Sequence, residues 1–349
     1  MNVIIENINN MRTRREFLQT LGAVGTTGLL SGLSSTALGC STEKNVLKPL
    51  KFGIVSDLHR DLMFDADERL EAFMKKVDVE KPDFFIDLGD FAFAIPKNED
   101  FAKRFASSKS PSYHVLGNHD MDRVDKKDAT AFFGMPAPYY SFDVNGYHGV
   151  VIDPNNIYSG DKFMDYEKGN YFSFGGRIGY LSDDQCDWLE DDLRKTNLPV
   201  FIFSHQSLLH DGGGIPNRAY VQRILERENE RCGFRKVLAC FNGHHHQDFY
   251  RVINGIHYFS INSASYQWDE EVPGRFPEEV KQKYPHANNM ATYKDPLFCF
   301  ITIEPSGKLS LRGVQSEWAV TPPRNAASKS VRYGNEDVPV ISDRDILLS

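Results

Sequence analysis

The fold is indicated by one short stretch of sequence, FGIVSDLH at residues 52–59. Its apolar first half is typical of a buried β-strand. The run ends at Asp57 and His59, two side chains of the kind that bind metal ions. Residues 67–79 follow with apolar side chains three and four residues apart, which predicts a helix packed on one face. A strand that leads into such a helix is the first unit of an α/β fold.

The same alternation continues along the chain. Pro82 ends the predicted helix, and further apolar runs predict strands at 84–88, 113–116, 200–203 and 237–241. Helices are predicted at 182–195, which opens with the capping sequence SDDQ, and near 218–229. Turn pairs predict hairpins at 145–146, between strands 139–142 and 149–152, and at 254–255 and 306–307. We therefore expect an α/β fold, an αββα sandwich of two sheets flanked by helices.

Composition narrows the class of protein. The chain has 349 residues, of which 41% are hydrophobic and 25% charged, as in an ordinary globular protein. Lys and Arg number 40 and Asp and Glu number 48, so the formal net charge is −8. An acidic chain has no global field that collects polyanions, so we expect no specific nucleic-acid binding. A metal site could still reverse the sign of the field inside one cleft.

Five of the predicted strands end in residues that can bind a metal. In chain order these motifs are DLH at 57–59, GD at 89–90, GNHD at 117–120, SH at 204–205 and GHHH at 243–246. In open α/β sheets, ligands bind beyond the carboxyl ends of the strands, so these side chains should converge there. One such motif alone carries little weight, but five in order predict a metal site.

The ordered series D-x-H, G-D, G-N-H-D, a single His and G-H-x-H resembles the calcineurin-like metallophosphoesterase superfamily over about residues 51–262. The resemblance implies a sandwich of two mixed sheets with a two-metal site at the strand ends. It implies that the first metal is held by Asp57, His59, Asp90 and His246. It implies that the second is held by Asp90, Asn118, His205 and His244, so that Asp90 bridges the two ions.

The same resemblance implies a catalytic role for His119, the histidine of the G-N-H-D motif that is not a ligand. Positioned histidines often act as general acids, so a protonated His119 would either stabilise the phosphorane-like transition state or protonate the departing oxygen. We expect the neighbouring Asp120 to orient that imidazole.

The residue types fit phosphoester chemistry. Two divalent ions clamp phosphoryl oxygens and lower the pKa of a bridging water. Imidazole, carboxylate and amide ligands suit Mn, Fe or Zn better than Mg or Ca, which favour all-oxygen shells. The expected function is therefore that of a dinuclear metal-dependent phosphoesterase in which a metal-bridging hydroxide attacks a small phosphodiester or nucleotide-type substrate. The alternatives are a broad-specificity phosphomonoesterase and a catalytically inactive metal-binding scaffold.

Two positions within the family motifs need separate interpretation. The run GDFAF at 89–93 places Phe93 where purple acid phosphatases carry the tyrosine that binds ferric iron, so we do not expect a purple enzyme. His245 is the variable residue inside G-H-x-H, and we expect it to face solvent because neighbouring residues on a turn point apart.

Substrate contacts are predicted from three residues and two inserts. Asn118 and His119 would contact substrate at the metals, and His210 would do so from a glycine-rich loop at 208–214, for which a flexible surface turn is the alternative. The insert at 154–180 carries six aromatic residues that either stack a nucleobase or, as we favour, pack the insert against the sheet. A polar insert at 266–296 is expected to wall the cleft.

The N-terminal residues 1–40 read as a leader. The run RTRREFLQ at 12–19 precedes a weakly apolar stretch and resembles a twin-arginine export signal. The leader ends at Cys40, either in a small-x-small cleavage site or in an imperfect lipobox with Ala37 in the usual aliphatic position. We therefore expect an exported protein, either periplasmic or lipid-anchored to the cell envelope through Cys40.

The mature chain divides into a phosphoesterase domain at 41–319 and a polar tail at 320–349 that wraps or frays. Cys240 and Cys299 lie in apolar strand-like runs, where a free thiol behaves as a small hydrophobic side chain.

Overall fold

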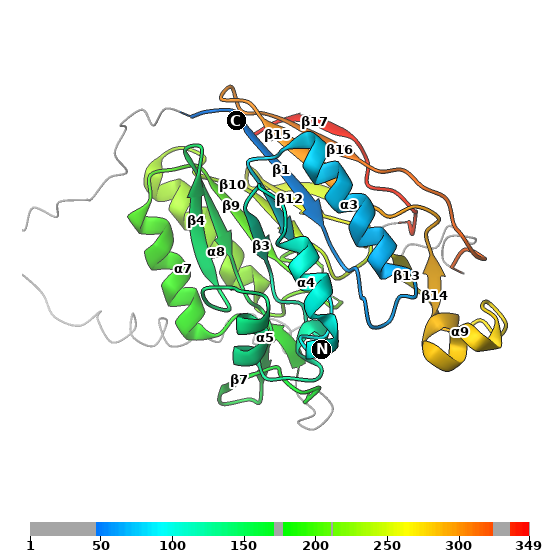
Figure 1. Ribbon diagram of the computed structural model, residues 1–349. Coiled ribbons are helices and arrows are strands. Elements are labelled where there is room, and N and C mark those ends of the chain that lie inside the picture. The colour runs from blue at the N-terminus through cyan, green and yellow to red at the C-terminus, as the bar shows by residue number, and fades with distance from the viewer. Residues whose placement is uncertain (1–46, 171–176, 211, 324–335, 349) are drawn as a thin grey trace, which may run out of the picture.

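The computed structural model describes residues 47–170, 177–210, 212–323 and 336–348. Two six-stranded mixed sheets pack face to face, with helices on their outer sides (Figure 1). The αββα sandwich expected from the sequence is confirmed. The predicted leader, including Cys40, lies outside the described residues.

The first sheet has the strand order β17-β16-β15-β1-β2-β3. Its strands are β1 (Leu50–Val55), β2 (Phe84–Asp87), β3 (Ser112–His114), β15 (Cys299–Ile303), β16 (Lys308–Gly313) and β17 (Arg344–Leu347). Strands β1, β2 and β3 run parallel, whereas β15 pairs antiparallel with β1. The carboxyl ends of the three parallel strands therefore meet at one edge of the sheet.

The second sheet has the order β11-β12-β10-β9-β5-β4. Its strands are β4 (Tyr140–Val144), β5 (Tyr147–Val151), β9 (Val200–Ser204), β10 (Val237–Asn242), β11 (Phe249–Ile253) and β12 (Ile256–Ser260). Strands β5, β9, β10 and β12 are parallel, and the predicted turns at Asn145 and Asn254 join the antiparallel pairs β4–β5 and β11–β12.

Helices and two small sheets complete the described fold. The α-helices are α3 (Ala66–Glu80), α4 (Glu99–Phe105), α5 (Lys126–Phe132), α7 (Asp183–Lys195), α8 (Arg218–Cys232) and α9 (Glu278–Lys283). Short 3-10 turns lie at Pro96–Asn98, His119–Met121 and Ala287–Asn289. The small sheets contain β6 (Asn156–Tyr158), β7 (Phe163–Asp165) and β8 (Arg177–Tyr180), and β13 (Tyr266–Trp268) with β14 (Met290–Thr292).

Alternating side chains separate the interior of the sandwich from its helical covers. Phe52 of β1 stacks on Phe84 of β2, with ring centroids 4.9 Å apart, and meets Phe241 of β10 from the second sheet at 5.7 Å. Residues on the opposite face of the second sheet, such as Val200 and Ile202, pack instead against α7 and α8. Burying one such side chain contributes about 1.5–3 kcal/mol to the stability of the fold. A strand that slipped along its neighbour would lose this burial, so the two apolar layers hold the strands in register.

Local signals set the helix boundaries. Ser182 caps α7, where its hydroxyl accepts a hydrogen bond from the backbone N–H of Gln185 at 3.3 Å. This helix therefore begins at the capping sequence predicted from the sequence. Helix α8 ends at Gly233, whose positive φ of 69° is readily adopted by glycine.

The structure shifts several of the predicted boundaries. The third strand ends at His114, two residues before the predicted end, and residues 115–118 form a loop that includes the first half of the G-N-H-D motif. The described part of the tail wraps: β17 pairs with β16 at the edge of the first sheet, so this part of the tail belongs to the sandwich. Within the described residues, none of the helices combines the length and apolar character needed to cross a bilayer.

Candidate metal centre

The candidate metal-binding residues lie in loops that follow parallel strands. Asp57 and His59 follow β1, Asp90 follows β2 and Asn118 follows β3. The second sheet supplies His205 after β9, and His244 and His246 after β10. The metal-capable atoms of Asp57, His59 and His246 all lie within 4.8 Å of one another, and so do those of Asp90, His205 and His244.

The first group surrounds a single point between the sheets. His59 Nε2 lies 3.2 Å from His246 Nε2, and Asp57 Oδ1 lies 3.3 Å from the same His246 nitrogen. Asp90 Oδ2 closes this group at 3.7 Å from His59 Nε2.

The second group uses the same Asp90 oxygen. Asp90 Oδ2 lies 3.1 Å from His205 Nε2, which in turn lies 3.1 Å from His244 Nδ1. One carboxylate oxygen therefore belongs to both groups, as a bridging ligand between two adjacent ions requires.

The donor set fits divalent metals. Asp57 Oδ1 is buried and has no hydrogen-bond partner among the described residues. Such an orphaned acceptor is costly unless a cation satisfies it. Separations of 3.1–3.8 Å between these donors are those expected for ligands that each lie about 2.0–2.2 Å from one ion.

Backbone carbonyls orient two of the imidazoles. His205 Nδ1 donates to the carbonyl oxygen of Leu88 at 2.8 Å, and His246 Nδ1 donates to that of Tyr266 at 2.6 Å. These bonds place a proton on Nδ1 and make Nε2 the nitrogen that can bind a metal. Burial opposes protonation of His205, but Asp90 raises its pKa to about 10, so a cation at Nε2 would displace a proton.

The backbone at the candidate ligands is strained. Five of them have positive φ although none is glycine: Asp57 (54°), His59 (51°), Asp90 (54°), His244 (67°) and His246 (51°). Such conformations cost about 1–3 kcal/mol each and persist where surrounding structure enforces them, commonly at functional sites. Close backbone approach adds a further constraint, because a Cβ at Gly117 would overlap the backbone nitrogen of Asp90.

Electrostatics favour the metal-binding protonation states at several ligands. Burial lowers the pKa of His59 to about 3, so this imidazole is neutral near pH 7. The pKa of Asp90 lies well below its ordinary value: burial opposes this, but His205 and His119 stabilise the carboxylate. Neutral imidazole and ionised carboxylate are the forms that coordinate a divalent cation.

His119 lies beside the two groups and is partly exposed. Its ring centroid is 5.2 Å from that of His59, and its side chain is 33% exposed. Burial works against protonation, yet the carboxylates of Asp90 and Asp122 raise the pKa of His119 to about 9. A small cavity joins His119 to the candidate ligands His59 and Asp90, and its other walls are Asp61, Leu62, Ala92 and Phe93.

The expected role of Asp120 is wrong. Asp122, not Asp120, holds the imidazole: His119 Nδ1 lies 2.7 Å from Asp122 Oδ2. The Asp120 carboxylate instead accepts hydrogen bonds from four backbone N–H groups, those of Asp90, Phe91, Ala92 and Gly117. Asp120 therefore fixes the loop that carries Asp90, the shared ligand candidate.

Asn118 is buried. It lies next to Asp90 along the backbone, since the N–H of the following residue, His119, donates to Asp90 Oδ1 at 2.8 Å. The side-chain oxygen of Asn118 lies 3.5 Å from Gln206 Nε2, one residue beyond His205. The residue is thus placed between the two sheets on the side of the second group.

The prediction for His245 is wrong, whereas that for His210 stays a prediction. His245 does not face solvent: it is 5% exposed, and its Nε2 donates to the carbonyl oxygen of Gly212 at 2.9 Å. His210 is equally buried and stacks on His245 with ring centroids 4.2 Å apart. His210 does not line the small cavity at His119, and its contact with substrate stays a prediction.

The insert at 266–296 walls the first group. The rings of Tyr266 and Trp268 on β13 lie 5.3 and 6.2 Å from the ring of His59. The insert at 154–180 forms the sheet of β6, β7 and β8, and Tyr158 packs there against Phe163 and Tyr180. Tyr171, Phe172 and Phe174 of this insert lie outside the described residues.

Sequence reasoning missed two residues beside His119. Asp122 was detectable, because its spacing of three residues from His119 is that of side chains on one helical turn. Tyr166 had no such signal: its hydroxyl donates to Asp122 Oδ1 at 2.5 Å, but 44 residues separate the two.

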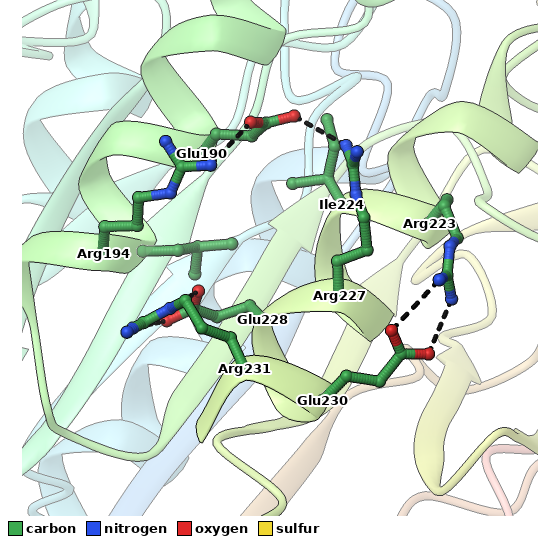
Figure 2. A pocket seen from close by; sticks show the side chains of 9 residues that line it. Glu190, Arg194, Arg223, Ile224, Arg227, Glu228, Glu230 and Arg231 are labelled. Carbon is green, nitrogen blue, oxygen red and sulfur yellow. Dashed lines mark hydrogen bonds and ion pairs between the residues drawn. The ribbon is translucent and has the colours of Figure 1, made fainter. Parts of the chain in front are cut away.

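A second hollow, of about 470 Å³, lies between α7 and α8 (Figure 2). It is lined by Glu190, Leu193, Arg194, Arg223, Ile224, Arg227, Glu228, Glu230 and Arg231. Each of its glutamates is ion-paired with an arginine, and none of the candidate metal ligands lines it. The pair of Glu190 with Arg227 joins α7 to α8, and each of the other pairs lies within one helix.

The fold and the two donor groups that share Asp90 define the class of protein: a two-sheet α/β sandwich with a candidate two-metal site at its strand ends. Residues 50–248 match the calcineurin-like phosphoesterase family. The match spans more than half of the sequence, so the chain belongs to this family.

Individual relatives are more distant. Purple acid phosphatase 22 of Arabidopsis thaliana is 26% identical over 236 residues, which cover 59% of this chain and 46% of that protein. The chain therefore spans about half the length of that relative. A dimetal phosphatase from Danio rerio shares the fold with a TM-score of 0.55 at 14% identity, covering 86% of this chain and 99% of that one.

Proposed function

We propose that this protein is a dinuclear metal-dependent phosphoesterase that prefers a phosphodiester or nucleotide-type substrate. The observation that carries the proposal is the position of Asp90 Oδ2, which lies 3.7 Å from His59 Nε2 and 3.1 Å from His205 Nε2. A carboxylate shared between two groups of donors matches the arrangement of a two-metal hydrolytic site.

The ligand residues have distinct tasks. Asp57, His59, Asp90 and His246 would hold one cation, and Asp90, Asn118, His205 and His244 the other. Bound Mn, Fe or Zn would neutralise phosphoryl oxygens and supply an acidified water molecule. Asp120 keeps Asp90 in place through the backbone of residues 90–92.

His119 is the residue we assign to the leaving group. It lies on the cavity next to Asp90, and Asp122 holds its Nδ1. Nε2 is therefore the nitrogen that is left to donate a proton to the departing oxygen. A positioned acid of this kind contributes about 10²–10⁴ in rate.

The cavity favours a diester over a monoester. Leu62, Ala92 and Phe93 form an apolar wall beside His119. A monoester dianion would present a third charged oxygen to its surroundings, whereas a diester presents an uncharged organic group that can contact an apolar wall.

A direct assay tests this function. The full chain, loaded with Mn, is compared on bis-p-nitrophenyl phosphate and p-nitrophenyl phosphate. The proposal expects a higher kcat/KM for the diester. A higher value for the monoester would favour the broad phosphomonoesterase, and no turnover of either substrate with both metals bound would favour the inactive scaffold.

We also propose that the leader directs export through the twin-arginine pathway to the periplasm or a lipid anchor at Cys40. The support is the sequence of residues 12–19 and the position of Cys40. Replacing Arg14 and Arg15 by Lys should leave the protein in the cytoplasm, as cell fractionation would show. Labelling with a radioactive fatty acid, lost in Cys40→Ser, separates the anchored from the soluble exported form.

A further inference from the structure

The insert at 154–180 reaches the candidate general acid through one side chain. Tyr166 follows β7, is 6% exposed, and donates its hydroxyl proton to Asp122 Oδ1 at 2.5 Å. The other oxygen of the same carboxylate lies 2.7 Å from His119 Nδ1. Asp122 thus accepts one hydrogen bond from the histidine and one from the tyrosine, so each of its two carboxylate oxygens has a hydrogen-bond partner.

The backbone around Tyr166 is fixed to the loop that carries His119. Lys168 N–H donates to the carbonyl oxygens of Met121 and Val124 at 2.7 and 3.0 Å. Tyr166 N–H donates to the carbonyl oxygen of Asn155 at 3.0 Å. The phenol therefore has a defined position relative to residues 119–124, independent of its own bond to Asp122.

The buried side chain of Lys126 forms ion pairs that also hold the segment around Tyr166. Lys126 Nζ lies 2.8 Å from Asp165 Oδ1 and 2.7 Å from Asp153 Oδ2, and the lysine side chain is 6% exposed. Lys126 belongs to α5, which follows the His119 loop, so the pair joins that helix to the insert. A buried charge held by two carboxylates resists displacement, because breaking it would leave an uncompensated ion.

We propose that Tyr166 is a positioning residue that fixes the imidazole of His119, through Asp122, for protonation of the leaving group. The insert at 154–180 is then part of the catalytic apparatus although it supplies no metal ligand. This inference rests on the proposed function, because it concerns the residue assigned there to the leaving oxygen.

The test must compare substrates whose leaving groups differ in their need for a proton. A poor leaving group needs a proton as its bond to phosphorus breaks, whereas p-nitrophenolate departs readily without one. Loss of the acid, or of its orientation, should therefore slow esters of phenol much more than esters of p-nitrophenol. A general loss of folding would slow both alike.

The experiment compares Tyr166→Phe with Tyr158→Phe in the full, Mn-loaded chain. Tyr158 is the matched control, because it lies in the same insert and, among the residues that the structure describes, its hydroxyl donates to the carbonyl oxygen of Gly160 within that insert. The substrates are methyl p-nitrophenyl phosphate and methyl phenyl phosphate, or the two aryl monoesters if the enzyme prefers those. We expect Tyr166→Phe to lower kcat about tenfold on the phenyl ester and less than twofold on the nitrophenyl ester. Tyr158→Phe should change neither.

A mutant cycle shows whether Tyr166 acts through His119. In a His119→Asn background, Tyr166→Phe should cause no further loss on the phenyl ester, because the group that it positions is gone. Equal losses from Tyr166→Phe with and without His119, or equal losses on both esters, would overturn the proposal.

A spectroscopic measurement separates this inference from the proposed function. The Nδ1 proton of His119 should give a downfield NMR resonance that shifts in Tyr166→Phe and is unchanged in Tyr158→Phe. A resonance insensitive to Tyr166→Phe would overturn the positioning role whatever the substrate. A sensitive resonance together with a His119→Asn enzyme that slows both esters equally would leave the positioning intact and overturn the acid role of His119.

Discussion

At the scale of single residues, the site is built from side chains that the backbone holds in unfavourable conformations. Five candidate ligands have positive φ, and Asp90 is the one whose Oδ2 reaches both groups of donors. His119 lies in the same cavity but has Asp122 as its ring partner. Metal binding and proton transfer should therefore be separable by substitution.

We predict that Asp90→Ala binds neither metal, whereas His119→Asn binds both and loses rate. Asp90 supplies the shared oxygen, and its removal leaves each group one anionic ligand short. Metal content by elemental analysis after gel filtration measures the first effect. A loss of about 10²-fold or more in kcat on methyl phenyl phosphate, whose leaving group needs a proton, measures the second at full metal content. A His119→Asn enzyme that is metal-replete and fully active would contradict the assignment.

Phe93 leads to a spectroscopic prediction. Its ring lines the cavity with His59 and Asp90, at the position where a purple acid phosphatase carries tyrosine. The iron-loaded protein should therefore lack a visible tyrosinate-to-iron band, and Phe93→Tyr should gain one. Tyr266 provides the control, since its phenol is buried against His59 and His246. A band in the unmodified protein that disappears in Tyr266→Phe would show that a different phenol binds the iron.

At the scale of elements, charged side chains join a helix to the strands that it covers. His148 of β5 lies 2.5 Å from Asp143 of β4 and 2.9 Å from Asp192 of α7. Burial opposes protonation of His148, but Asp192 and Asp143 raise its pKa above the ordinary value. The protonated imidazole therefore links the β4–β5 hairpin to α7.

This link should make stability depend on pH in a known direction. Because the pKa of His148 is raised in the folded state, its contribution is fully present below the unfolded pKa of about 6.5 and is lost as pH rises through the folded pKa. His148→Gln should lower the free energy of unfolding by about 1–2 kcal/mol near pH 6 and by less near pH 9. Denaturant titration at both pH values measures this, and an equal loss at each would contradict the ion-pair explanation.

The elements also show which features a sequence can predict. The strand ends were predictable because apolar runs stop at metal-capable residues, and parallel strands bring those ends to one edge. The contact of Tyr166 with Asp122 was not predictable, because it depends on how an insert folds over a loop 44 residues away. The burial of His245 was missed for a related reason: its neighbour is the carbonyl oxygen of Gly212, in a different loop.

At the scale of the whole molecule, the C-terminal segment adds a strand to the first sheet and contacts residues next to a candidate metal ligand. Strand β17 extends the first sheet. Asp337, in the same segment, is 2% exposed. Asp337 Oδ1 accepts hydrogen bonds from the side-chain amides of Gln247 and Gln267, both at 2.7 Å. The Gln267 amide also donates to the carbonyl oxygen of His246 at 3.0 Å. The polar composition that suggested a wrapping or fraying tail gave no sign of this contact, which depends on residues 70 and 90 positions away.

This connection predicts that a substitution in the tail weakens the metal centre. Asp337→Ala removes the acceptor shared by two buried amides, so we expect a loss of about 2–3 kcal/mol in the free energy of unfolding. Because the backbone of His246 is bonded to the same Gln267 amide, the variant should also release metal faster to a chelator. Asp345→Ala is the matched control, since Asp345 lies on β17 in the same tail but pairs with Arg312 at the exposed surface. Unfolding curves and chelator-competition rates that are the same for both variants would show that the tail does not support the centre. A selective effect of Asp337→Ala would instead show that the last residues of the chain stabilise the ligands that follow β10.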